Sequence, residues 1–147
     1  REMTKTACLL LSGALLLAAK DPVDAVNRGK DGLALKGYDA VAYFKESNAV
    51  KGNPSFQHSW MGATWQFSSA ANLAEFQANP AKYAPQFGGY CAWAVSKNYT
   101  ADADPQAWKI VDRKLYVNYN KDVQKMWEKD MGERIRSAES NWPKLHK

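Results

Sequence analysis

Residues 88–96 read Gly-Gly-Tyr-Cys-Ala-Trp-Ala-Val-Ser, and the rest of the chain is organised around this stretch. Its two glycines can adopt backbone conformations that other residues avoid. The alternation of Cys91, Trp93 and Val95 favours a β-strand. A short helix opened by the glycines is the alternative, and it would lower the pKa of the Cys91 thiol by placing it at a helix N-terminus. The conformation of this stretch therefore bears on the reactivity of the cysteine.

Apolar and alternating segments on either side predict β-strands. Residues 41–44 (Val-Ala-Tyr-Phe) predict a short apolar strand. Residues 56–60 and 64–67 alternate on either side of a Met-Gly-Ala turn, which predicts a β-hairpin. A second hairpin is predicted over residues 108–119, with its turn at Asp112-Arg113, where a two-residue turn requires positive φ.

Two helices are predicted from capping and spacing. The first covers residues 70–78, with Ser68 or Ser69 as its cap, and ends before a proline. The second is long and covers residues 120–140, with the asparagine at its start as the cap, an apolar stripe along one face, and Pro143 as its stop. Together these segments predict an α+β fold: a small antiparallel sheet built from hairpins, with one short and one long C-terminal helix packed on it.

Length and composition fit one globular domain. The chain has 147 residues, of which 46% are hydrophobic, and this is enough to bury a core. The domain is expected over residues 37–143, after an extended lead-in over residues 26–36. The 20 basic and 15 acidic residues give a net charge of +5, but no run of Lys and Arg reaches the roughly five to eight residues that mark a nucleic-acid patch. Nucleic acid is therefore not an expected partner.

The N-terminus predicts export. Basic residues precede an apolar run over residues 7–19, and small residues follow it, as is typical of a secretory signal peptide. The run is shorter than the roughly 20 residues needed to span a membrane, although an uncleaved anchor is the alternative. We assign residues 1–25 to the signal peptide, with cleavage after Ala19 or Ala25. The mature protein is expected to be exported, periplasmic or extracellular, without stable membrane insertion.

Cleavage changes the setting of the remaining cysteine. It would remove Cys8 and leave Cys91 alone in an oxidising compartment. An odd cysteine in an exported protein indicates an intermolecular thiol partner, a metal ion or a reactive thiol. A buried and inert Cys91 is the alternative, because free cysteines are often small core residues.

The order of these features resembles the YHS domain family, in particular its exported, stand-alone members. The resemblance rests on five motifs, which lie at residues 37–44, 62–69, 76–92, 104–105 and 115–119. It implies the fold, whereas chemistry has to be argued from the site.

The resemblance also carries two implications for metal and redox chemistry. Shorter YHS and TRASH-like domains carry cysteines at places that fall on Ser68 and Asn72 here, so that soft-metal site is absent from this chain. Exported members similar to this chain carry selenocysteine at the place of Cys91. The exchange of sulfur for selenium implies redox or soft-metal chemistry at this position.

A soft-metal site centred on Cys91 is the first functional hypothesis. Copper or zinc would need further His, Cys or Met ligands, and His58 is the candidate helper. His146 and the methionines are the other donors, but no local spacing joins any of them to the cysteine. The protein would then be an exported binding module and not an enzyme.

Two further hypotheses use the same residue differently. Cys91 would serve as a redox thiol if it were accessible and its pKa were lowered, or it would be structural and inert. Tyr90 and Trp93, with two further tryptophans, are candidates for stacking on a planar ligand, although core packing explains such a set equally well. The expected partners are a metal ion or a thiol partner.

Overall fold

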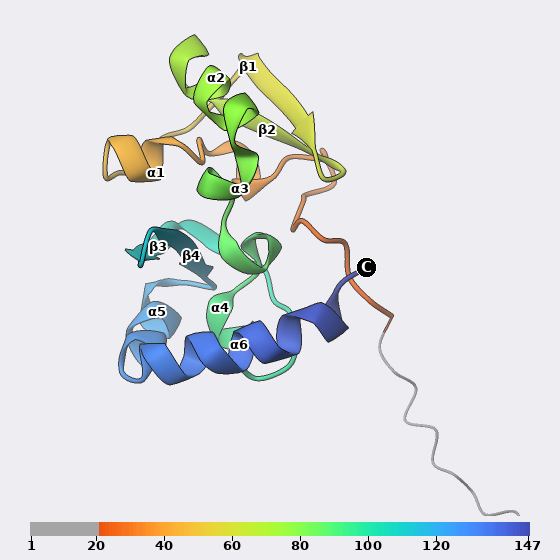
Figure 1. Cartoon of the computed structure of the whole chain (residues 1–147), viewed down its shortest axis with the longest axis vertical. Helices are drawn as coiled ribbons and strands as arrows, with labels where there is room; N and C mark the ends of the chain where they lie inside the picture. The colour runs from red at the N-terminus through yellow and green to blue at the C-terminus, as the bar shows by residue number, and fades with distance from the viewer. Residues whose placement is uncertain (1–20) are drawn as a thin grey trace, which may run out of the picture.

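The computed structural model describes residues 21–147 and has an α+β architecture (Figure 1). Its strands form two antiparallel hairpins, β1 (Asn53–Trp60) with β2 (Ala63–Phe67) and β3 (Asp104–Val111) with β4 (Lys114–Asn118). The predicted hairpins are confirmed. They form two separate two-stranded sheets and not the single small sheet that we expected.

Both hairpins turn through two residues with positive φ. Met61 and Gly62 have φ of 53° and 76°, and Asp112 and Arg113 have φ of 50° and 65°. Positive φ at both central positions is the type I′ turn, whose twist matches that of the flanking strands. The second turn therefore accepts two non-glycine residues in this conformation, as its length requires.

The predicted strand over residues 41–44 is wrong, because these residues begin a helix. Helix α1 spans Ala42–Lys45. The side chain of Asp39 accepts hydrogen bonds from the backbone N–H groups of Val41, at 2.8 Å, and Ala42, at 3.1 Å. This capping satisfies the first backbone donors of a helix, and it overrides the β-propensity of the apolar run.

The short predicted helix is confirmed. Helix α2 spans Ala70–Ala78, and Ser69 is its cap, since its hydroxyl accepts the backbone N–H of Asn72 at 3.1 Å. Helix α3 (Pro80–Tyr83) follows directly, with its proline in the first turn, where no backbone donor is needed.

The predicted long helix is two helices. Helix α5 (Lys121–Glu128) is capped by Asn120 as expected, and α6 (Met131–Leu145) follows it. The chain breaks because Asp130 is non-helical, with φ of −138° and ψ of 41°. Pro143 lies inside the last turns of α6 and does not stop it. The break lets α6 cross beneath α4 and α5 (Figure 1).

Two hydrophobic clusters make the core, and β4 lies between them. Phe67 and Phe76 belong to the first cluster, together with Leu115 and Val117 of β4. Tyr116 belongs to the second cluster, which packs against α5 and α6. Successive strand residues point to opposite faces, so β4 is buried on both sides and joins the two halves.

The lead-in is tied to the core. Residues 21–34, which we call the strap, run past both halves of the molecule (Figure 1). Val23 forms a parallel bridge with His146, Asn27 donates its backbone N–H to the Gly88 carbonyl at 2.8 Å, and Leu33 bridges Thr64. The strap thus contacts the first hairpin, the glycine stretch and the end of α6.

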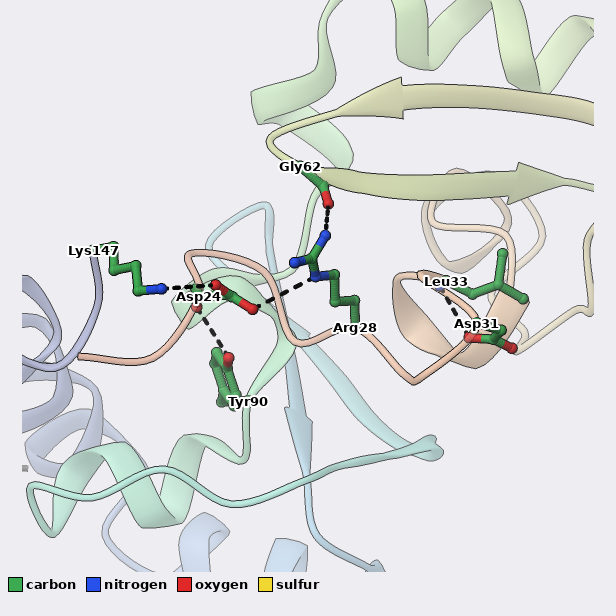
Figure 2. Close-up of polar contacts among 7 residues, drawn as sticks. All are labelled: Asp24, Arg28, Asp31, Leu33, Gly62, Tyr90 and Lys147. Atoms are coloured by element: carbon green, nitrogen blue, oxygen red, sulfur yellow. Dashed lines mark hydrogen bonds and ion pairs between the residues drawn. The ribbon is translucent and has the colours of Figure 1, made fainter. Parts of the chain in front are cut away.

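Polar contacts hold the strap at one point (Figure 2). The Asp24 carboxylate pairs with Arg28, at 3.5 Å, and Lys147, at 3.6 Å. The backbone carbonyl of Asp24 accepts a hydrogen bond from the Tyr90 hydroxyl at 3.0 Å. Arg28 also donates to the Gly62 carbonyl at 2.6 Å. These exposed ion pairs fix geometry more than they add stability.

Residues 1–20 of the predicted leader lie outside the described residues, and its remaining residues, 21–25, belong to the strap, so cleavage after Ala25 would remove the contacts of Val23 and Asp24. Within residues 21–147, no helix combines the length and the apolar character needed to cross a bilayer.

Candidate functional site

Cys91 caps a short helix and does not lie in a strand. Helix α4 spans Ala92–Ser96, and Cys91 immediately precedes it. The chain reaches this position through a tight turn in which Phe87 and Gly88 have φ of 56° and 62°. The alternative prediction of a short helix is thus confirmed, and the predicted strand is wrong. Ala92 and Val95 of α4 lie three residues apart on one helix face, and both are buried in the second cluster.

The Cys91 thiol is buried among backbone donors. The residue is 1% exposed. Its sulfur accepts the backbone N–H of Tyr119 at 3.2 Å. Burial raises the pKa of the Cys91 thiol, and hydrogen bonds from the backbone N–H groups of Ala94, Tyr119 and Trp93 oppose this rise without cancelling it. The lowered pKa that we expected from a helix N-terminus is therefore not found.

Asn118 completes the surroundings of the sulfur. Its side-chain oxygen accepts the Trp93 backbone N–H at 3.0 Å and the Cys91 thiol proton, with the sulfur at 3.6 Å. The Trp93 donor fixes which end of the amide is oxygen. The amide nitrogen then has no hydrogen-bond partner within residues 21–147, although the residue is fully buried. A buried, unpaired donor next to a thiol requires a physical explanation.

The thiol lies under a shallow, mostly apolar depression of about 250 Å³. The residues that line it with Cys91 are Trp93, Ala94, Tyr99, Ala101, Tyr119 and Val123. Among these described residues there is no histidine, methionine or carboxylate. The depression therefore offers a soft metal one thiolate and no second soft ligand.

The candidate metal ligands are dispersed. His58 lies half-buried on β1, with its ring 6.4 Å from that of Phe76 in the first cluster, and it does not line the depression. His146 stacks on Trp142, with ring centroids 4.3 Å apart. Within residues 21–147, no group of three or more His, Cys, Asp and Glu side chains is arranged to hold a metal ion. The pairing of Cys91 with His58 stays a prediction from sequence.

The predicted stacking residues are occupied by other contacts. Lys97 and Arg134 lie over the Trp93 ring, at 5.3 and 4.1 Å from its centroid. Tyr90 packs against Trp142, at 5.8 Å between centroids. Cation–π contacts of this kind hold a ring in place. A planar ligand at Trp93 would have to displace the two cations.

Ser68 and Asn72 take part in a buried polar network. Both donate to the second carboxylate oxygen of Asp39: the Ser68 backbone N–H and hydroxyl at 2.8 and 2.7 Å, and the Asn72 amide at 2.8 Å. Asp39 is fully buried, and its other oxygen caps α1. Positions where the resemblance implied thiolates in shorter domains thus hold hydrogen-bonded polar groups.

A larger cleft was not foreseen from the sequence. It measures about 330 Å³ and lies where the strap, the first hairpin and α6 meet. The aromatic residues that line it are Trp60, Trp65, Phe87 and Trp142. They come from distant parts of the chain, so only the exposed Met61 beside Trp60 at the hairpin tip could have indicated it.

Comparison with known families accounts for the part of the structure that precedes Cys91. Residues 41–87 match the family model of the YHS domain. This segment is a YHS domain. It covers about a third of the chain, from α1 through both strands of the first hairpin to α3. Cys91 lies just beyond the end of the matched YHS domain.

Comparisons with curated proteins and with solved structures gave no match. The chemistry of Cys91 therefore has to be argued from its surroundings.

Proposed function

We propose that this YHS domain protein is an exported thiol-redox protein with Cys91 as its reactive residue. The observation that carries the proposal is the set of polar contacts at the buried sulfur, which accepts the Tyr119 backbone N–H at 3.2 Å and donates its proton to the Asn118 side-chain oxygen at 3.6 Å. The oxidant is a small hydroperoxide, and the reductant is a thiol on another molecule.

The reaction balances with these two reactants. The Cys91 thiolate attacks one peroxide oxygen, the O–O bond breaks, and the leaving hydroxide or alkoxide takes up a proton. Sulfur is thereby oxidised to a sulfenic acid. An external thiol then attacks that sulfur, releases its oxygen as water and forms a mixed disulfide. A second thiol reduces the disulfide and restores Cys91.

The surroundings of the sulfur suit both the thiolate and the sulfenic acid. The backbone N–H groups of Trp93, Ala94 and Tyr119 stabilise negative charge on the thiolate. The Asn118 side-chain oxygen, which accepts the thiol proton, would also accept the hydroxyl proton of a sulfenic acid. Burial keeps the resting thiol protonated and out of reach of large reactants, so neither the accessibility nor the lowered pKa expected of a redox thiol is met. The oxidant and the reducing thiol therefore both have to be small, and the reaction has to be slow.

The copper- or zinc-binding module uses the same thiol and comes second. A soft cation on Cys91 needs further nitrogen or sulfur ligands, and among the described residues the depression supplies none. The metal version therefore depends on a ligand from elsewhere, such as His58 or a partner.

The test is mass spectrometry of the purified full chain after brief exposure to hydrogen peroxide, with dimedone to trap sulfenic acid. We expect one trapped adduct at Cys91 and none there in Cys91→Ser. A matched control is Cys91→Ser combined with Ser96→Cys, which moves a buried thiol along α4. This relocated thiol lacks the Asn118 contact and should oxidise at least about tenfold more slowly.

Three results would overturn the proposal. If the native thiol reacts only after unfolding, Cys91 is structural. If the relocated thiol is oxidised as fast as Cys91, the Asn118 surroundings are irrelevant. If the native protein contains stoichiometric copper or zinc that Cys91→Ser loses, the metal module is correct.

A further inference from the structure

The aromatic cleft is separate from the thiol depression and shares no lining residue with it. Four segments meet around it: Ala25 and Val26 of the strap, Trp60 and Met61 at the hairpin tip, residues 81–88, and Trp142 near the end of α6. The ion pairs and hydrogen bonds of Figure 2 hold the strap segment in this position. The cleft is thus formed by the complete fold.

The aromatic walls are fixed in place. The Trp65 indole N–H donates to the Trp60 carbonyl at 3.0 Å, and the two rings meet edge to face at 5.7 Å. On the other side, Phe87 and Trp142 meet edge to face at 6.3 Å, and His146 stacks on Trp142. A preformed cavity of this size with aromatic walls is typical of a small-molecule site.

The charged residues that line the cleft favour a cationic ligand. Glu139 is the one acidic residue that lines it, and no Lys or Arg does so, although the chain has 20 of them. The Glu139 carboxylate has no ion pair within residues 21–147. Aromatic ring faces and a carboxylate both attract organic cations. His146 also lines the cleft, with its ring stacked on Trp142, and anions such as phosphates would find neither Lys nor Arg here.

We propose that this cleft binds a small planar organic cation, such as a protonated heteroaromatic amine. The ring system would lie against the tryptophans, and its positive charge would face Glu139. The net charge of the chain is +5, which attracts anions. The cleft, which is lined by one carboxylate and by no Lys or Arg, attracts a cation instead. The proposal is independent of Cys91.

The test compares two tricyclic probes of similar shape, aminoacridinium and anthracene carboxylate, titrated into the full chain and followed by probe fluorescence. We expect saturable binding of the cation at one site and much weaker binding of the anion. Glu139→Gln should weaken cation binding about three- to fivefold, as expected for one exposed charge. Glu133→Gln makes the same charge change on α6 outside the cleft, and it should leave binding unchanged.

Met61→Lys gives a second, gentle variant, because Met61 is 55% exposed. Its added positive charge should weaken binding of the cationic probe further and leave the circular dichroism spectrum unchanged.

Equal binding of both probes, or no effect of Glu139→Gln, would overturn the proposal. So would cation binding that appears only when residues 1–20 are removed, since that would assign the cleft to the N-terminal segment. A dimer that Met61→Lys dissociates would assign it to a second copy.

Discussion

Replacing Asp39 with asparagine tests whether the buried polar network holds the YHS domain together. The carboxylate is fully buried, and every contact that it makes is with a donor. One oxygen accepts from Val41 and Ala42, and the other from Ser68 and Asn72. Asparagine keeps the shape but replaces one oxygen with an NH₂ group, which faces donors in either orientation of the amide.

The expected cost follows from those contacts. Either orientation leaves at least two buried donors without an acceptor, and each such donor costs about 1–3 kcal/mol. We therefore expect Asp39→Asn to lower the free energy of unfolding by about 3 kcal/mol. This corresponds to a change of about a hundredfold in the folding equilibrium.

Urea unfolding, followed by tryptophan fluorescence, measures this loss. The midpoint should fall by about 1–3 M for a protein of this size. Glu75→Gln is the matched control, since Glu75 is an exposed carboxylate that pairs with Lys45 at 2.8 Å, and exposed pairs contribute little. The reasoning is refuted if Asp39→Asn shifts the midpoint no more than Glu75→Gln does.

Three further predictions follow from the glycine turn, the thiol and the strap. Gly88→Ala places a methyl group against the Ala25 carbonyl at a φ of 62°, so it should cost about 2 kcal/mol and lower the melting temperature; an unchanged melting curve would contradict the close approach. Because burial raises the pKa of Cys91, less thiolate is present at any given pH than for a free thiol. Alkylation by iodoacetamide should therefore rise with pH, with a midpoint above the ordinary value of about 8.5, whereas a midpoint below that value would show that the backbone donors prevail over burial. Val23→Pro removes the backbone N–H that donates to the Leu145 carbonyl at 2.9 Å. Limited proteolysis should therefore cut the strap faster in this variant than in Val23→Ala. Equal rates would mean that the position of the strap does not depend on this hydrogen bond.

Local signals in the sequence were sufficient for the hairpins and for α2. The two-residue turns and the Ser69 cap act over a few residues, and both are visible as spacing. The error at α1 has a local cause too, because Asp39 lies two residues before the apolar run and its capping role was overlooked. The break at Asp130 has a local signal as well, since Asp is a favoured N-cap and Glu133 follows three residues later, and the apolar stripe that continues across it concealed this signal.

The candidate site was predicted only in part. Cys91 could be singled out as a lone thiol, and a short helix at this position was one of the two conformations considered. Asn118 could not be found, because it lies 27 residues further along, within a strand whose pattern suggests only packing. The aromatic cleft depends on contacts between the strap, the hairpin and α6, which no local pattern encodes.

The strap also sets the order in which the molecule can be completed. Val23 bonds to residues on both sides of His146, so the earliest described segment pairs with residues 145–147. Closing a loop of about 120 residues carries an entropic cost that only a largely folded interior reduces. The first hydrophobic cluster uses no residue after β4, so it can form while the ribosome is still extending the chain. The aromatic cleft has to wait until Glu139, Trp142 and His146 have left the ribosome, and a truncation before α6 would leave it open on one side.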